Sequence, residues 1–125
     1  MISFEDFLLE DDSPIYLQII QYVKRGIVSG AIENGEEMIS RRALSTLLGV
    51  NPNTIQKAYH MLEEEGIIRS RVGAKSCVEV DEAIKERIRL ALLSQDTISW
   101  VQAMKQMGVD LEEAVKLARE TWDKV

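Results

Sequence analysis

The chain has 125 residues, enough for one modest domain or for a small domain with an appendage. Of these residues 46% are hydrophobic and 29% charged, which is ordinary for a soluble globular protein. A single cysteine excludes an intramolecular disulfide bond, and the presence of only one histidine in addition argues against a His/Cys metal site. No apolar segment is long enough to cross a bilayer, and the acidic N-terminus is not typical of a signal peptide. We therefore expect a cytoplasmic protein with no membrane partner.

Residues 1–12 are acidic, with Phe4, Phe7, Leu8 and Leu9 interspersed, and predict a short helix or an arm that packs on a neighbouring surface. The first regular helix is predicted over Pro14–Ser29, because Ser13 can cap it and proline is tolerated at the first helical position. Its apolar side carries Ile15, Ile19, Tyr22, Val23 and Ile27, and Gly30 ends it.

A loop with an Asn34-Gly35 turn follows, after which Met38 and Ile39 could form a very short strand. Ser40 is a good N-cap for a second helix over Arg41–Leu48. The predicted apolar side of that helix consists of Leu44, Leu47 and Leu48, and Gly49 stops it.

The third helix is predicted between Asn51, an N-cap, and Gly66, a left-handed C-terminal cap. Pro52 occupies its first position. Helical spacing places Ile55, Ala58, Tyr59 and Leu62 on one side and Asn53, Thr54, Gln56, Lys57 and His60 on the other. Amides, a hydroxyl and a cation near a helix start can contact base edges in a major groove. The alternative is an ordinary amphipathic helix with a polar solvent side.

The two helices, joined by a short turn containing glycine, have helix-turn-helix spacing. Two strands, Ile67–Val72 and Ser76–Val80, are predicted next and would form a wing. Its apolar face would carry Ile68, Val78 and Val80, leaving Arg69, Arg71 and Lys75 for a phosphate backbone. The alternative is a solvated basic hairpin.

The distribution of charge favours DNA binding by the third helix and the wing over a merely solvated surface. The net charge of −6 argues weakly against nucleic acid as a partner. From Met38 to Val78, however, the sequence contains six basic residues and three glutamates, which gives this segment a net charge of +3. An acidic protein can therefore still present one basic face to DNA.

Residues 81–125 predict two or three helices, the first starting at Asp81 or Glu82 and the last capped by Asp110. The polar stretch near Gln95 leaves open whether the first is continuous or broken. Two or three helices of this size cannot bury their own apolar faces. We therefore predict a homodimer in which the C-terminal helices of two chains pack together. The expected dimer core is Ile84, Ile88, Leu92, Val101, Met104, Met107, Leu111, Val115 and Trp122.

The predicted fold is mainly α (α+β): a winged helix-turn-helix over 1–80, with the arm 1–12, and a helical dimerisation part over 81–125 that could also respond to an effector. No catalytic or metal-binding constellation and no cofactor-binding motif is visible, so an enzyme is not expected. A winged helix used for protein–protein contact is the alternative function, but it would expose apolar residues where this sequence has amides and a lysine.

Residues 14–78 resemble the winged helix of the GntR superfamily of bacterial transcription regulators. The matching segments are PIYLQI at 14–19, SRRALSTLLGV at 40–50, NPNTIQKAY at 51–59, LEEEG at 62–66 and RVGAKSCV at 71–78. The NPNTxQ form and the short tail resemble the YtrA-type subfamily. The resemblance implies a homodimeric regulator, usually a repressor, on a palindromic operator in double-stranded DNA, often near transporter genes. It implies neither a cofactor nor a particular effector.

The resemblance also implies roles for individual residues. Arg42 would bind phosphate or a base, Ser40 would meet the backbone, and Gly73 would form the wing tip. The full expected DNA-binding set is Ser40, Arg41, Arg42, Asn51, Asn53, Thr54, Gln56, Lys57, Arg71, Gly73 and Lys75. The sequence departs from the family pattern at Ile39, Pro52, Gln56, Lys75 and Cys77. Pro52 and Gln56 stand where other branches of the family have arginines, so contacts from arginine to guanine are not implied at these positions.

Overall fold

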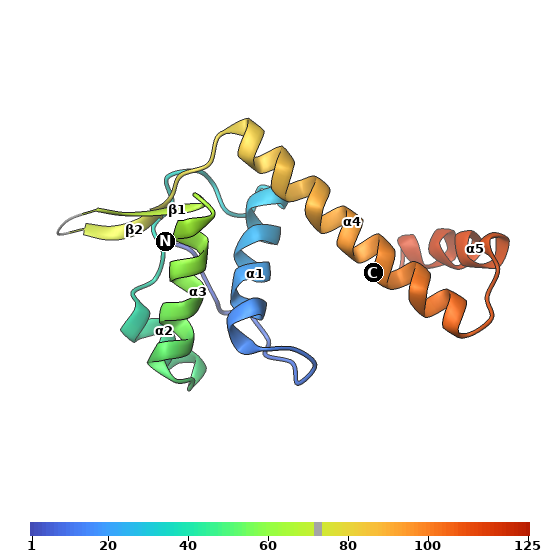
Figure 1. Cartoon of the computed structure of the whole chain (residues 1–125), viewed down its shortest axis with the longest axis horizontal. Coiled ribbons are helices and arrows are strands. Elements are labelled where there is room, and N and C mark those ends of the chain that lie inside the picture. Colours follow the sequence, from blue (N-terminus) through green and yellow to red (C-terminus); the bar gives the residue numbers. More distant parts are fainter. Residues whose placement is uncertain (72–73) are drawn as a thin grey trace. The chain divides into compact units, whose positions relative to one another are not determined.

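Three helices and a two-stranded antiparallel sheet form the N-terminal unit of the structure, a computed structural model that describes residues 1–71 and 74–125 (Figure 1). The elements are α1 (Ile15–Ser29), α2 (Arg41–Leu48), α3 (Pro52–Glu64), β1 (Ile68–Arg71) and β2 (Ala74–Val78). The chain divides into two units, Met1–Arg89 and Leu90–Val125. The helix that follows β2 begins in the first unit and ends in the second. The predicted mainly helical fold with a winged helix-turn-helix is confirmed.

Helix α1 supplies one wall of the core. Ile19, Ile20, Val23 and Ile27 are buried on one side of it, and Gly30 ends it in a left-handed conformation with φ of 87°. The predicted cap at Ser13 is wrong: Pro14 is the N-cap, and no side chain caps the helix. The Gln18 side chain lies at this end instead, donating to the carbonyls of Glu10 and Ser13.

Helices α2 and α3 start where their caps predict. The Ser40 side chain accepts a hydrogen bond from the backbone N–H of Ala43, and the Asn51 side chain accepts one from Asn53. Each cap satisfies one backbone donor that the first turn leaves free. One prediction is wrong here, because Leu47 is 55% exposed and does not pack in the core.

The strands differ from the predicted ones: β1 (Ile68–Arg71) is shorter than predicted, and β2 (Ala74–Val78) lies two residues closer to the turn. Ile68 pairs with Val78 and Arg69 with Cys77, and the register shifts before Arg71. The predicted strand at Met38–Ile39 is wrong, since only an isolated bridge joins Glu37 to Cys77. Ile68, Val78 and Val80 are buried, as the alternation of apolar residues predicts. The hairpin therefore covers the helices with one face and presents the other to solvent.

The N-terminal arm is an extended segment that packs on the same unit. Ile2 and Phe4 are buried, and the Ile2 N–H donates to the Glu37 carbonyl at 2.9 Å. The Tyr22 hydroxyl donates to the Ser3 carbonyl at 2.7 Å, and the Tyr22 and Phe4 ring centroids lie 4.9 Å apart. Of the two predicted forms of residues 1–12, the arm is confirmed and the helix is wrong. The arm thus enlarges the core of the winged helix.

Among the described residues, Tyr59 is the largest fully buried side chain, and its hydroxyl donates to the Ile39 carbonyl at 2.6 Å. We expect Tyr59→Phe to lower the free energy of unfolding by about 1 kcal/mol, because it removes this hydrogen bond and keeps the ring. Urea denaturation measures the change. Tyr16→Phe is the control, since the Tyr16 hydroxyl has no hydrogen-bond partner among residues 1–71 and 74–125. Equal stability of both variants would contradict the expectation.

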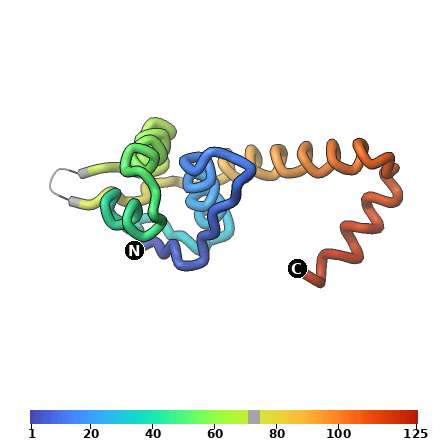
Figure 2. Tube along the Cα trace, turned by 90° about the horizontal axis from the view of Figure 1, so that it is seen from below, coloured from blue at the N-terminus to red at the C-terminus, as the bar shows by residue number. Residues whose placement is uncertain are grey.

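The C-terminal part contains α4 (Glu82–Gln106) and α5 (Leu111–Trp122), and the chain turns back between them (Figure 2). The Asp110 carboxylate accepts from the Glu113 N–H, so the predicted cap of α5 is confirmed. Of the two predicted starts of α4, Glu82 is the first helical residue, and the Asp81 carboxylate accepts from the Ile84 N–H. The stretch near Gln95 lies inside one uninterrupted helix. Neither proline nor glycine occurs in α4 to break it.

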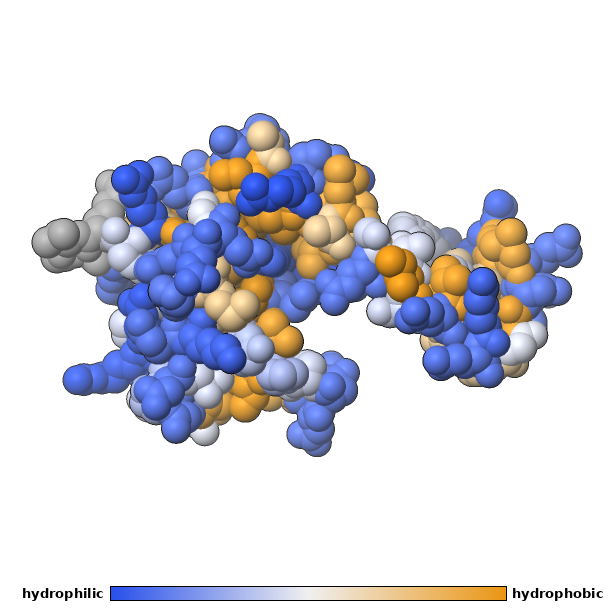
Figure 3. Space-filling model, viewed as in Figure 1, coloured by the Kyte–Doolittle hydropathy of each residue, from blue (hydrophilic) through white to orange (hydrophobic). Residues whose placement is uncertain are grey.

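Much of the apolar surface of the C-terminal helices is exposed in the single chain (Figure 3). Of the residues predicted for a dimer core, Ile88 and Leu92 are already buried, and Ile84 and Met104 are half-buried. Those left exposed are Val101, Met107, Leu111, Val115 and Trp122. Exposed apolar surfaces are typical of interaction sites.

Candidate nucleic-acid interface

The first turns of α3 present polar side chains to solvent. Asn53, Gln56 and Lys57 are exposed and Thr54 is half-buried, while Ile55 faces the core. Pro52 and the Asn51 cap fix where the helix begins and hence which side chains project from its start. Amides here have both a donor and an acceptor, which suits them to bidentate contacts with adenine.

Lys57 is held by a partner that the sequence did not indicate. Its Nζ lies 4.0 Å from the centroid of the Tyr16 ring on α1, a cation–π contact. The contact draws the ammonium group toward α1. Lys57 therefore lies at the edge of the exposed α3 surface, whereas Asn53 and Gln56 have no such restraint within residues 1–71 and 74–125.

Arg41 is also engaged within the protein. Its guanidinium lies 5.1 Å from the centroid of the Tyr59 ring, and Nη2 is 3.4 Å from Oε1 of Glu63 on α3. Burial raises the pKa of Tyr59 well above its usual value, only partly opposed by Arg41, so the ring stays neutral. Arg41 thus links the start of α2 to the last turn of α3.

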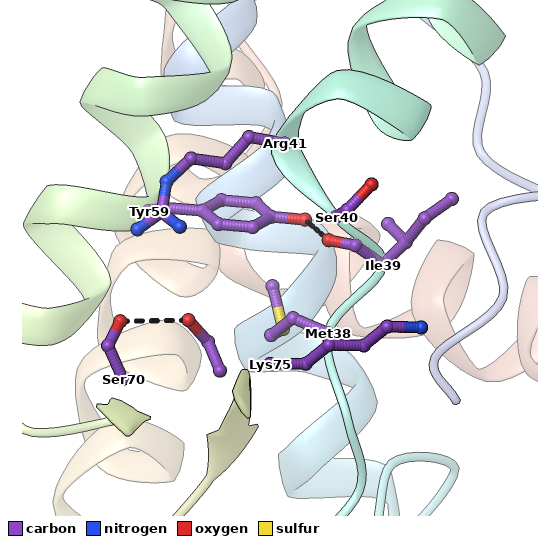
Figure 4. Close-up of a pocket in the computed structure, with 8 residues that line it drawn as sticks. Met38, Ile39, Ser40, Arg41, Tyr59, Ser70 and Lys75 are labelled. Atoms are coloured by element: carbon purple, nitrogen blue, oxygen red, sulfur yellow. Dashed lines mark hydrogen bonds between the residues drawn. The ribbon is translucent and has the colours of Figure 1, made fainter. Parts of the chain in front are cut away.

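A hollow of about 470 Å³ separates the start of α2 from the hairpin (Figure 4). Arg41 extends along one face of the Tyr59 ring, and Lys75 lies on the far side of the hollow from Arg41. The remaining lining residues are Met38, Ile39, Ser40, Ser70 and Ser76. Two cations and three serine hydroxyl groups around one open hollow are suited to an anion.

The other basic residues differ in whether an acidic side chain of the protein already pairs with them. Arg42 is exposed and makes no ion pair within the described part of the chain. Arg69 is exposed but lies 3.3 Å from Oε1 of Glu79. Two predicted site residues cannot be placed, because Gly73 and the side chain of Arg71 lie outside the described residues.

Across residues 1–71 and 74–125, no group of three or more His, Cys, Asp or Glu side chains could hold a metal ion. None of the described helices combines the length and apolar character that a membrane span requires.

A helix-turn-helix with a wing, exposed amides at the start of its second helix and cations around α2 and the hairpin define a DNA-binding protein of the winged-helix class. The family model described as "Bacterial regulatory proteins, gntR family" matches residues 15–78. The chain belongs to this family, whose members are transcription regulators rather than enzymes.

Particular relatives agree with this assignment. The HTH-type transcriptional repressor YtrA of Bacillus subtilis strain 168 is 34% identical over 102 residues, covering 82% of this chain and 74% of YtrA. A GntR family transcriptional regulator from Listeria monocytogenes has a similar structure, with a TM-score of 0.78 at 34% identity, covering 90% of this chain and 98% of that one.

The DNA-binding domain of AraR, solved in complex with operator ORX1, matches with a TM-score of 0.50 at 28% identity, covering 61% of this chain and 92% of that one. A structurally similar domain has thus been observed on operator DNA. The chain is a DNA-binding transcription regulator of YtrA-like type.

Proposed function

We propose that the protein is a homodimeric repressor that binds a palindromic operator in the cytoplasm and controls a transporter operon. The observation that carries sequence-specific binding is the exposed, capped start of α3 with Asn53 and Gln56. Repression is supported by the similarity to a protein named as a repressor. The transporter target is supported by the resemblance to the YtrA-type subfamily.

Base contacts are proposed for Asn53, Thr54 and Gln56. Phosphate contacts are proposed for two sets of residues on either side of them. The α2 set is Ser40, Arg41 and Arg42, with Asn51 at the turn and Lys57 at the edge of α3. The wing set is Arg71, Gly73 and Lys75. This division follows the usual one, in which phosphate contacts position a protein and base contacts specify the sequence.

Dimerisation is proposed through the exposed apolar residues of the C-terminal helices. A palindrome pairs two identical half-sites, which two identical reading helices can occupy together. The Leu90–Val125 unit leaves Trp122 79% exposed and Leu111 77% exposed, which is costly for a monomer in water. A second copy of the same helices would cover both. A small-molecule effector, if one binds, would act through the same unit.

A matched pair of substitutions tests the proposed division of labour. We expect Gln56→Ala to blur preference at one base pair per half-site, at a cost of about 1–3 kcal/mol per lost bidentate contact. Arg42→Ala is expected to weaken binding to all sequences similarly. Selection from a pool of randomised duplexes measures both, and A·T pairs should be among the specified positions. Unchanged preference in Gln56→Ala would remove Gln56 from the base-contacting set.

The alternative, a winged helix that binds another protein, has weaker support. Protein-binding surfaces are enriched in aromatic residues at their centre. The exposed positions of α3 carry no large apolar side chain: they are Pro52, Asn53, Gln56, Lys57, His60 and Glu64. Failure to select any duplex would favour this alternative.

A further inference from the structure

Glu63 occupies a junction between four elements. Its Oε1 atom accepts from the Ser70 hydroxyl of β1 and pairs with Arg41 of α2. The Ser70 hydroxyl lies 2.9 Å from that of Ser76 on β2. One carboxylate on α3 thus connects the wing to the basic start of α2, although no proposed function requires an acidic group there.

Arg41 is poorly satisfied by this arrangement. The separation of 3.4 Å from Glu63 is long for a charge-assisted hydrogen bond. Its Nε atom is buried and has no hydrogen-bond partner among the described residues. The guanidinium borders the hollow that also contains Lys75, Ser40 and Ser76. The Arg41 side chain is 37% exposed, so its accessible donors can serve an anion that enters the hollow.

We propose that Glu63 is a positioning residue that restrains DNA binding: it holds Arg41 in the free protein and competes for it with a DNA backbone phosphate. This inference rests on the proposed phosphate contact of Arg41. A phosphate in the hollow would offer the guanidinium several oxygen acceptors in place of one distant carboxylate oxygen. DNA binding must first break the ion pair between Arg41 and Glu63. The free energy that this costs reduces the gain from the contact between Arg41 and phosphate in the wild-type protein.

The same carboxylate gives the restraint a second effect. Because Glu63 also accepts from Ser70, it fixes the hairpin relative to α3 while it holds Arg41. Glutamine at position 63 keeps an oxygen that can accept from Ser70 but removes the charge. Glu63→Gln therefore separates the electrostatic restraint from the structural support of the wing.

The first test uses the full-length protein and a short duplex of random sequence, so that it does not depend on a palindromic operator. We expect Glu63→Gln to bind the duplex about 2- to 5-fold more tightly than the wild-type protein does. This ratio of affinities corresponds to the free energy of a partly exposed ion pair. Glu64→Gln is the control, because it removes the same charge one residue away, where Glu64 pairs with His60 at 2.7 Å. Glu63→Gln binding no more tightly than Glu64→Gln would overturn the proposal.

A double-mutant cycle shows whether Glu63 acts through Arg41. In the Arg41→Ala background, Glu63→Gln should lose its advantage over Glu64→Gln, because no guanidinium remains to release. A gain that persists without Arg41 would mean that Glu63 repels DNA directly, and the proposal would be wrong. If Arg41→Ala leaves the affinity of the wild-type protein unchanged, Arg41 does not bind phosphate and the inference also fails.

A third measurement needs no destabilising change. The Nε–H resonance of Arg41 in the full-length wild-type protein, assigned with Arg41→Lys, reports on the guanidinium directly. Addition of duplex DNA should shift this resonance as phosphate replaces Glu63. A resonance that does not move when DNA binds would overturn the proposal even if Glu63→Gln failed to fold. Binding of DNA with no preference for a palindrome would instead count against the proposed repressor function alone.

Discussion

Full-length protein carrying Val115→Glu and Trp122→Glu is expected to be a monomer and to bind a palindromic duplex about 10²- to 10⁴-fold more weakly than wild type. Both residues lie on the exposed apolar side of α5, at 39% and 79% exposure. A carboxylate there would be buried without a partner in a dimer, which is costly. Since a dimer binds its second half-site at high effective concentration, loss of the dimer removes that advantage.

The control keeps the added charge and changes the side of the helix. Lys116→Glu alters the net charge by the same two units, but Lys116 is exposed and pairs only weakly with Glu120 at 3.9 Å. It should remain a dimer. Light scattering gives the mass of each variant, and a gel shift gives its affinity. Dimers in both variants would place the interface elsewhere, with the exposed Leu8 and Leu9 of the arm as the next surface to test.

The second large effect concerns salt. If each protomer makes about three to four phosphate contacts, a dimer makes about six to eight, and log K against log salt should fall with a slope of roughly −5 to −7. Between 50 and 200 mM salt the affinity would then fall about 10³- to 10⁴-fold. The cause is the release of counterions from the DNA by Arg42, Lys75 and their neighbours. Nothing needs to be mutated for this measurement.

The salt dependence also bears on the distribution of charge. The whole chain has a net charge of −6, so the basic face must act locally. Arg42→Ala in both protomers should make the slope less steep by about 2, because each protomer loses one phosphate contact. A slope near zero on the best duplex would contradict a DNA-binding face built from these residues.

Local signals predicted the helix-turn-helix well. Each helix start depends on residues no more than three positions apart: Ser40 caps the N–H of Ala43, and Asn51 caps that of Asn53. Pro52 is itself the first residue of α3. Such short-range chemistry is visible in a sequence because each cap and its helix are neighbours in the chain. The same holds for Asp110 at the start of α5. The exposed set on α3 followed from the 3.6-residue period.

Pairs that join distant elements could not be predicted. Arg41 and Glu63 are 22 residues apart, and the contact between Lys57 and Tyr16 depends on how α1 packs against α3. No periodicity encodes such contacts. The burial of Phe4 depends in the same way on Tyr22. The sequence therefore indicated which side chains are basic but not which of them are already paired.

The C-terminal helices show a different limit. Apolar residues such as Val115 and Trp122 were predicted to share one side of a helix, and they do remain together as an exposed set. Whether that set faces its own chain or a second copy depends on how much surface one chain can cover. Thirty-six residues in the Leu90–Val125 unit are too few to cover it. The dimer thus stays a prediction.

Selection of duplexes from a randomised pool by purified full-length protein tests the central claim most directly. The proposed function predicts enrichment of one palindromic sequence with two half-sites that contain A·T pairs, bound by a dimer. The half-sites should be centred about one helical turn apart, or a multiple of one turn. A pool that stays random after repeated selection, or a single unpaired half-site bound by a monomer, would contradict a dimeric sequence-specific regulator.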